Sequence, residues 1–163
     1  MRRVTGALNQ PPPLIDRQTG ALMLPTGSIG RDLTRAAFLS SPMGAQARCD
    51  DKGTLGMSAY LGPQPVDDLV FGVELHFVGE QLRGYSLWLD DPRYGTSWDD
   101  YSEGKQRAQR DAHDAWLLST LGPGDRGPIP QGRELRYTFP WGEVWSTFDA
   151  RGGSSTIGVR FER

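Results

Sequence analysis

The sequence predicts an α+β fold: a mostly antiparallel sheet of about six or seven strands, one long helix packed across one face of the sheet, and a short N-terminal helix. Only the segment 98–122 is long and periodic enough for a long helix. Most other segments are short, alternate between apolar and polar residues, and are separated by glycine and proline, of which the chain has 21 and 12. A chain of 163 residues suits one hydrophobic core. We therefore expect an extended or disordered arm at 1–19 and a single domain at 20–163.

The segment 98–122 is expected to form an amphipathic helix. At about 100° per residue, small and apolar residues gather on one side, namely Tyr101, Gly104, Ala108, Ala112, Ala115 and Trp116. The opposite side is charged and holds Glu103, Arg107, Arg110 and Asp114. Asp100 and Ser102 are alternative N-caps, and Gly122 followed by Pro123 is expected to end the helix.

The first third of the chain is predicted from shorter patterns. Three consecutive prolines at 11–13 favour an extended arm, and Leu14 and Ile15 are expected to pack against the fold where the arm ends. Apolar residues at helical spacing predict a short helix at 28–41, with Ser28 or Asp32 as the cap. Short strands are expected at 20–24, 45–48 and 55–61.

A first hairpin is predicted at 70–78 and 81–89, since Gly79 comes first in a two-residue turn and a type II′ turn needs a positive φ there. The simplest register places Val73 opposite Ser86 and Leu75 opposite Gly84 on the core side. On the polar side, that register pairs Glu74 with Tyr85 and His76 with Arg83.

A second hairpin is predicted at 142–149 and 154–162, after a strand at 134–139. Its four-residue loop sets a register in which Val144 faces Val159 on an apolar side. On the polar side, Glu143 faces Arg160 and Trp145 faces Gly158. The two hairpins together therefore predict a sheet with one apolar face and one polar face.

Charge and cysteine content exclude several classes of function. A net charge of −2 and an isoelectric point of about 5.7 provide no overall basic field, so we expect neither nucleic acid nor membrane as a partner. Cys49 is the single cysteine, and the Asp50-Asp51 pair reads as a solvated turn, so no metal or cofactor is expected. Residues 4–14 lack the apolar run of a signal peptide, which predicts a cytoplasmic protein.

Catalytic motifs of serine hydrolases, zinc peptidases and P-loop enzymes do not occur in the sequence, and we assign no catalytic residue. The most polar and aromatic segment is 90–98 with the residues that follow it. An alternative reading is therefore a small-ligand site or a hydrolase that uses this loop with a helix histidine, through Asp91, Tyr94, Trp98, Asp99 and His113.

Exposed tryptophan, tyrosine and arginine are typical of protein interfaces. The predicted polar side of the sheet carries such residues, and it gives a candidate partner-binding set of Trp145, Glu143, Arg160, Glu74 and Tyr85. We therefore expect a protein that acts by binding another protein rather than by catalysis.

The order of motifs from 68 to 162 resembles an uncharacterised group of small bacterial α+β proteins. The resemblance is carried by Trp98, Tyr101, Ser102 and Glu103; Arg107, His113, Trp116 and Leu117; Leu121 and Gly122; Trp141, Gly142 and Val144; and Asp149, Ser155 and Ile157. Small bacterial proteins of this kind are often immunity partners of secreted antibacterial toxins, so the resemblance implies a toxin-neutralising protein. A secretion or structural accessory subunit is a further alternative that would use the same surface.

Overall fold

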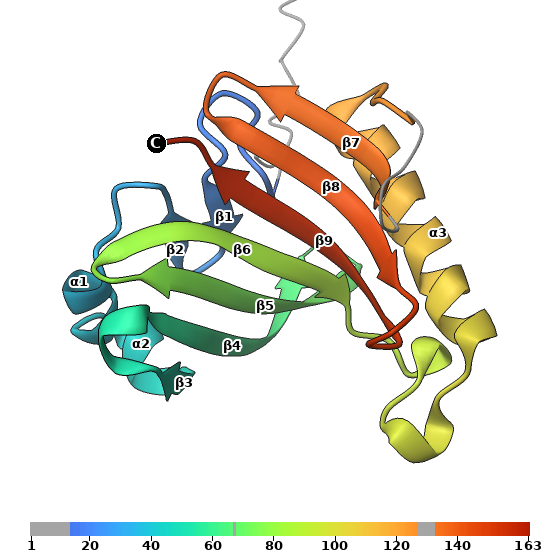
Figure 1. Ribbon diagram of the computed structural model, residues 1–163, viewed down its shortest axis with the longest axis horizontal. Coiled ribbons are helices and arrows are strands. Elements are labelled where there is room, and N and C mark those ends of the chain that lie inside the picture. The colour runs from blue at the N-terminus through green and yellow to red at the C-terminus, as the bar shows by residue number, and fades with distance from the viewer. Residues whose placement is uncertain (1–13, 67, 127–132) are drawn as a thin grey trace, which may run out of the picture.

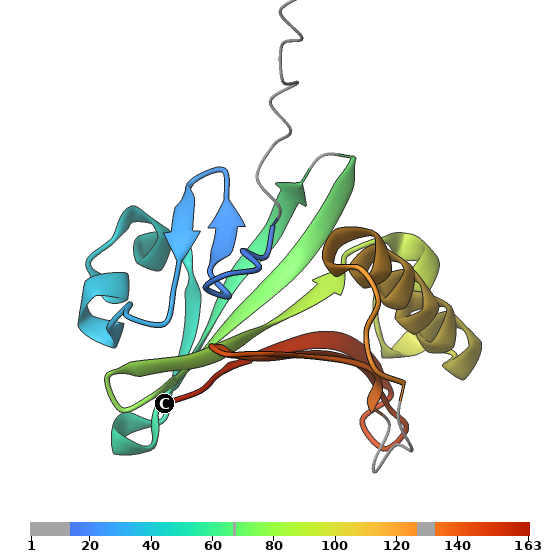
Figure 2. The same cartoon turned by 90° about the horizontal axis from the view of Figure 1, so that it is seen from above.

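The computed structural model describes residues 14–66, 68–126 and 133–163, and these form a strongly twisted antiparallel sheet with helices packed on it (Figures 1 and 2). The seven strands lie in the order β3-β4-β5-β6-β9-β8-β7, and every neighbouring pair is antiparallel. Their bounds are β3 Arg48–Asp51, β4 Met57–Val66, β5 Leu69–Val78, β6 Gln81–Leu89, β7 Arg133–Phe139, β8 Gly142–Asp149 and β9 Ser154–Phe161. The predicted α+β class and the antiparallel sheet are confirmed.

The helices and a small hairpin all contact the same face of the sheet. The long helix α3 (Glu103–Leu121) lies at one end of the strands (Figure 2), and its Trp116 meets Phe71 of β5 at 4.9 Å between ring centroids. At the other end of the strands, the short helix α1 (Arg35–Leu39) packs Phe38 against Phe77 at 5.6 Å. The two-stranded β1 (Leu22–Leu24) and β2 (Gly27–Ile29) share this core.

The register of the β8–β9 hairpin is the predicted one. Val144 pairs with Val159, Glu143 with Arg160, and Trp145 with Gly158. The side chains of Val144 and Val159 are buried in the core.

The predicted register of the β5–β6 hairpin is wrong by one residue over most of its length. A bulge between His76 and Phe77 leaves Arg83 as an extra residue in β6, so Leu75 pairs with Tyr85 instead of Gly84. Because a shift by one residue moves every side chain to the other face, Tyr85 points into the core and is 0% exposed. Tyr85 is therefore excluded from the open side of the sheet, where the sequence reading had placed it.

Removing the hydroxyl of Tyr85 tests this register. The Tyr85 hydroxyl donates a buried hydrogen bond of 2.7 Å to the carbonyl of Gly20. We expect Tyr85→Phe to lower the free energy of unfolding by about 1 to 2 kcal/mol in urea denaturation. The half-buried Tyr94 provides the matched control, since Tyr94→Phe should leave the midpoint unchanged. An unchanged midpoint for Tyr85→Phe would contradict the bulged register.

The long helix is capped as expected, but the predicted buried stripe was wrong. Ser102 is the N-cap and accepts from the backbone N–H of Lys105, while Gly122 ends the helix with a φ of 81°. Residues 98–100 form a separate 3-10 turn before it. Ala108 and Ala115 are exposed. The buried residues are instead Gln109, His113, Asp114, Leu117 and Leu121, which lie nearly half a turn away, on the side that the sequence predicts to be charged.

The first third of the chain differs most from the prediction. The segment 28–41 does not form one helix: its start belongs to β2, and α1 begins after Thr34, whose side chain caps it. A second short helix, α2 (Pro42–Gln46), is capped by Ser41 and occupies the expected strand start. The Asp50-Asp51 pair lies in β3 rather than in a turn, and Asp51 pairs with Arg35 at 2.5 Å.

Leu14 and Ile15 are buried, as predicted for the end of the arm. Residues 16–19 form a turn that belongs to the fold, because the indole N–H of Trp141 donates to the carbonyl of Arg17 at 2.9 Å. The predicted arm is therefore too long at its C-terminal end, and its residues 1–13 lie outside the described part of the chain. None of the helices in the described ranges has the length and apolar character needed to cross a membrane.

Candidate functional surfaces: the open sheet face and a hollow at its end

One side of the sheet is not covered by any helix of the described residues, and we call it the open face. Along β5, burial alternates, so that Val73 and Leu75 are inside while Glu74 and His76 are half-buried on the other side. The strand pairings place the following side chains together on the open face: Tyr60, Glu74, His76, Ser86, Trp88, Arg136, Glu143, Trp145, Thr156 and Arg160. Four of the five predicted interface residues lie there, and Tyr85 does not.

Two tryptophan rings lie flat on the open face because each one is opposite a glycine. A Cβ added to Gly158 would come within 2.3 Å of the Trp145 ring, and one added to Gly72 within 2.1 Å of the Trp88 ring. The missing side chains therefore leave room for each indole to rest directly on the backbone of the neighbouring strand. Tyr60 stacks on Trp88 with a centroid distance of 5.7 Å and an interplanar angle of 12°.

The carboxylate of Glu143 is held between two arginines. Arg136 donates from Nε to one carboxylate oxygen at 2.9 Å, and Arg160 approaches the other oxygen at 2.5 Å. Glu143 is 7% exposed, whereas the arginine side chains are 42% and 56% exposed. A carboxylate so deeply buried requires such partners. The cluster therefore fixes two guanidinium groups, Arg136 and Arg160, on the same surface as Trp145.

His76 belongs to the open face as a hydrogen-bonded side chain. Its Nε2 lies 2.9 Å from the hydroxyl of Ser86, and its partner across the strands is Gly84 rather than the predicted Arg83. Burial lowers the pKa of His76 below its usual range, and the nearby Glu74 opposes that shift only in part. The imidazole is therefore neutral at pH 7.

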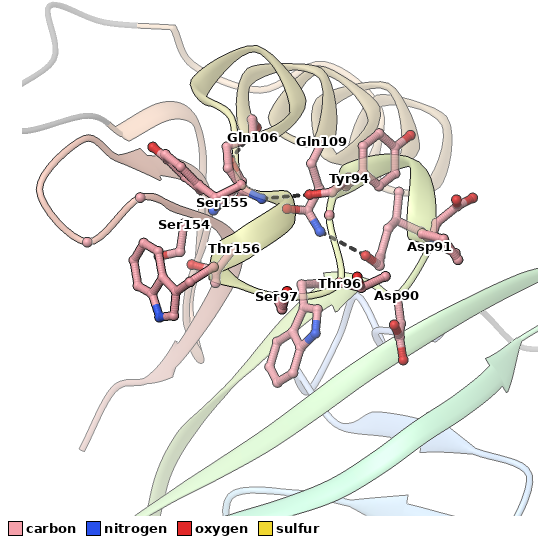
Figure 3. A pocket seen from close by; sticks show the side chains of 18 residues that line it. Asp90, Asp91, Tyr94, Thr96, Ser97, Gln106, Gln109, Ser154, Ser155 and Thr156 are labelled. Atoms are coloured by element: carbon pink, nitrogen blue, oxygen red, sulfur yellow. Dashed lines mark hydrogen bonds between the residues drawn. The ribbon is translucent and has the colours of Figure 1, made fainter.

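A hollow of about 590 Å³ opens where β6 and β9 separate. These strands pair from Gly84 opposite Arg160 to Leu87 opposite Ile157 and then diverge. Figure 3 shows the side chains of Gln106 and Gln109 from α3 above the hollow. The start of β9 lies on one side, and Tyr94 and Asp91, from the loop that follows β6, lie on the other. Residues 88–91, 94–98 and 152–156 supply most of the wall.

Polar side chains of α3 replace the missing strand partners at this separation. Gln109 donates to the carbonyl of Leu89 at 2.8 Å, and His113 accepts from the N–H of Leu89 at 2.9 Å. Gln106 accepts from the N–H of Ser155 at 3.0 Å and donates to the carbonyl of Tyr94 at 2.9 Å (Figure 3). Buried backbone groups need such partners. This requirement explains why the buried stripe of the helix is polar in its first half.

His113 is a structural residue in this arrangement. Burial lowers its pKa to about 4, so the imidazole is neutral at pH 7. Because Nε2 accepts the Leu89 N–H, the ring proton resides on Nδ1. The imidazole lies behind the backbone of β6 and does not line the hollow.

The residues of the alternative ligand site are only partly brought together. Asp91, Tyr94 and Trp98 line the hollow, whereas Asp99 and His113 do not. The Asp91 carboxylate is bound by Arg93 at 2.7 Å, and this contact holds the pKa of Asp91 below its usual range. The predicted convergence of Asp91, Asp99 and His113 on one pocket is therefore wrong.

Sequence reasoning missed Gln106, Gln109, Ser155 and Trp88. Gln106, Gln109 and His113 recur at spacings of three and four, followed by Leu117, which is the pattern of one helix face. That pattern was a usable signal, but glutamine is mostly exposed in proteins and the stripe looked too polar to be buried. For Trp88, correct placement required knowledge of the bulge in β6.

The fold and these surfaces define a small α+β protein with an open antiparallel sheet face. Comparisons with protein-family models, with curated proteins and with solved structures found no match to the chain.

Proposed function

We propose that this protein acts by binding another protein through the open face, and that its partner is a secreted antibacterial toxin that it neutralises in the bacterial cytoplasm. The observation that carries the binding proposal is the Trp145 ring, which rests on Gly158 beside the Arg136–Glu143–Arg160 cluster. The choice of a toxin as the partner rests on the sequence resemblance to small bacterial α+β proteins.

The physical support is the combination of residue types and their fixed geometry. Tryptophan and arginine supply most of the binding energy in many protein interfaces. A side chain that already occupies one position loses less conformational entropy on binding than a mobile one. Trp145 is held on the sheet and Arg160 is held by Glu143, so both residues meet this condition.

The proposed contact set is a revision of the set expected from the sequence. Trp145, Arg160 and Glu74 contact the partner, and Glu143 acts by orienting the two arginines. Trp88 takes the place of Tyr85, because it lies on the open face and Tyr85 lies in the core. A secretion or structural accessory subunit would use the same residues, and only the identity of the partner separates these two functions.

The proposal is tested by affinity capture from the native organism. Immobilised protein is exposed to lysate and secreted fractions, and bound proteins are identified by mass spectrometry. We expect one stoichiometric partner that is retained by the wild type and by Trp98→Ala, and lost with Trp145→Ala. Expression of that partner should be toxic to bacteria, and co-expression of this protein should restore growth. A captured partner that is harmless would contradict the toxin assignment and favour an accessory role.

A variant of Gly158 tests whether the position of the Trp145 ring matters, because it displaces the ring without removing it. In Gly158→Ala, the added methyl would meet the indole at 2.3 Å, so the ring must leave the sheet. We expect a loss of about 1 to 3 kcal/mol in unfolding free energy, measured in urea, and weaker capture of the partner. Gly104→Ala is the matched control, because its Cβ has 4.0 Å to its nearest neighbour and helix propensity favours alanine. Equal stability of the two variants would show that the ring does not depend on Gly158.

A further inference from the structure

The hollow between β6 and β9 has the size of a small-molecule site. Its volume of about 590 Å³ falls inside the range of roughly 300 to 1,000 Å³ that is usual for such sites. The side chains of Gln106 and Gln109, which lie against it, are fixed by hydrogen bonds to the end of β6, the start of β9 and the loop after β6. Side chains from β6, the 90–98 loop, α3 and β9 meet there (Figure 3).

The charges around the hollow disfavour an anionic ligand. Its described wall contains the carboxylates of Asp90 and Asp91 and no lysine, arginine or histidine. Arg93 compensates Asp91 from within the same loop. Asp90 is exposed and is therefore the one carboxylate of the wall that remains available to a ligand.

The hydrogen bonds at the strand ends disfavour an added peptide strand. Such a strand would need the free N–H and carbonyl groups of an exposed sheet edge. At this separation, both backbone groups of Leu89 and the N–H of Ser155 are already bonded to α3. The hollow is thus suited to a ligand that is recognised through side chains.

The side chains that remain are aromatic rings and neutral hydrogen-bonding groups. Trp98 is 77% exposed at the rim, and its ring lies 5.5 Å from that of Tyr101, which is 39% exposed. Hydroxyl groups of Ser97, Ser154 and Thr156 also line the wall. Gln109 also lines the hollow; its side-chain N–H donates to the carbonyl of Leu89, and its carboxamide oxygen can accept a hydrogen bond. Exposed aromatic rings next to hydroxyl, amide and carboxylate groups match a ligand that has both apolar faces and many hydroxyls.

We propose that the hollow binds a neutral saccharide. The C–H face of a sugar ring packs on Trp98 and Tyr101, whose rings offer apolar area at low entropic cost. The carboxylate of Asp90 and the carboxamide oxygen of Gln109 accept hydrogen bonds from sugar hydroxyls, and the serine and threonine hydroxyls both donate and accept. This site goes beyond protein binding at the open face: it shares Trp88 and Thr156 with that face, but Trp145 and the Arg136–Glu143–Arg160 cluster do not line it.

The test is an array of immobilised neutral glycans that includes glucose, galactose, mannose and N-acetylglucosamine oligomers, probed with the full chain. Titration of the best glycan by calorimetry then gives the affinity. We expect Trp98→Ala to weaken binding by at least about tenfold and Asp90→Asn by a smaller factor. Trp145→Ala should bind the glycan as the wild type does, which keeps this result independent of the protein-binding proposal.

Three results would overturn the saccharide proposal. The first is an array on which no neutral glycan binds. The second is a glycan affinity that is the same for the wild type, Trp98→Ala and Asp90→Asn, which would place binding elsewhere. The third is Trp98-dependent binding of choline, titrated as a cationic probe, together with no binding of neutral glycans. The aromatic rings would then bind a cation.

Discussion

Replacing Trp145 with alanine is expected to weaken partner binding by at least about 1 to 2 kcal/mol, which is roughly a tenfold rise in Kd. The indole covers Gly158 and lies beside two oriented arginines, so its loss removes a large apolar group from the open face. Surface plasmon resonance with the captured partner measures this change. The free energy of unfolding should change by about 1 kcal/mol or less, because Trp145 is half-buried and lies outside the core cluster.

Two controls give this result its meaning. Trp98→Ala also removes an exposed tryptophan, but it removes it from the hollow and should leave partner affinity unchanged. Arg160→Lys keeps the charge but loses the planar contact with Glu143, so an intermediate loss of affinity is expected. If Trp145→Ala instead unfolds the protein at ordinary temperature, the ring is a stability element and the interface must lie elsewhere.

The protein is expected to lose stability in mild acid because His113 is buried in its neutral form. Its pKa is about 4 in the folded state, against about 6.5 in an unfolded chain. Between these values, the unfolded state binds more protons, so stability rises with pH. The contribution is complete above about pH 6.5 and is lost progressively as the pH falls towards 4, by about 3 kcal/mol in all. Urea denaturation at several pH values measures it.

The variant His113→Gln isolates this contribution. Glutamine can still accept from the N–H of Leu89, but it does not titrate, so the stability difference between the wild type and the variant should shrink as the pH falls from 6.5 to 4. Acidic groups such as Asp51 and Asp100, whose pKa values are lowered by Arg35 and Lys105, titrate in both proteins and cancel in the difference. Parallel pH profiles for the two proteins would show that His113 does not control acid stability.

The second hairpin shows that the local sequence pattern can predict strand register. Every pairing predicted between 142–149 and 154–161 is present, because a short loop of known length fixes which residues face each other. The first hairpin has an equally clear turn, and its register still failed. A bulge adds one residue to β6, and the alternation of residue types around Arg83 does not reveal it.

The candidate sites divide in the same way. Trp145, Glu143 and Arg160 were found together because they belong to one hairpin with a predictable register. The hollow combines the end of β6, the start of β9 and one face of α3, which are distant in the sequence. His113 looked like a member of a ligand site and proved to be a hydrogen-bond partner of Leu89, because only the packing of α3 shows what its side chain meets.

The sequence by itself determined the elements that depend on neighbouring residues: the β-rich α+β class, the turns at Gly79 and 150–153, and the end of the long helix at Gly122, with Ser102 as one of two candidate N-caps. These features follow from backbone preferences and from short-range hydrogen bonds. The tertiary structure decided the bulge in β6, the buried face of α3 and the hollow. The buried face of α3 and the hollow share one cause: backbone groups at the separation of β6 and β9 need hydrogen-bond partners, and Gln106, Gln109 and His113 supply them from a distant part of the chain.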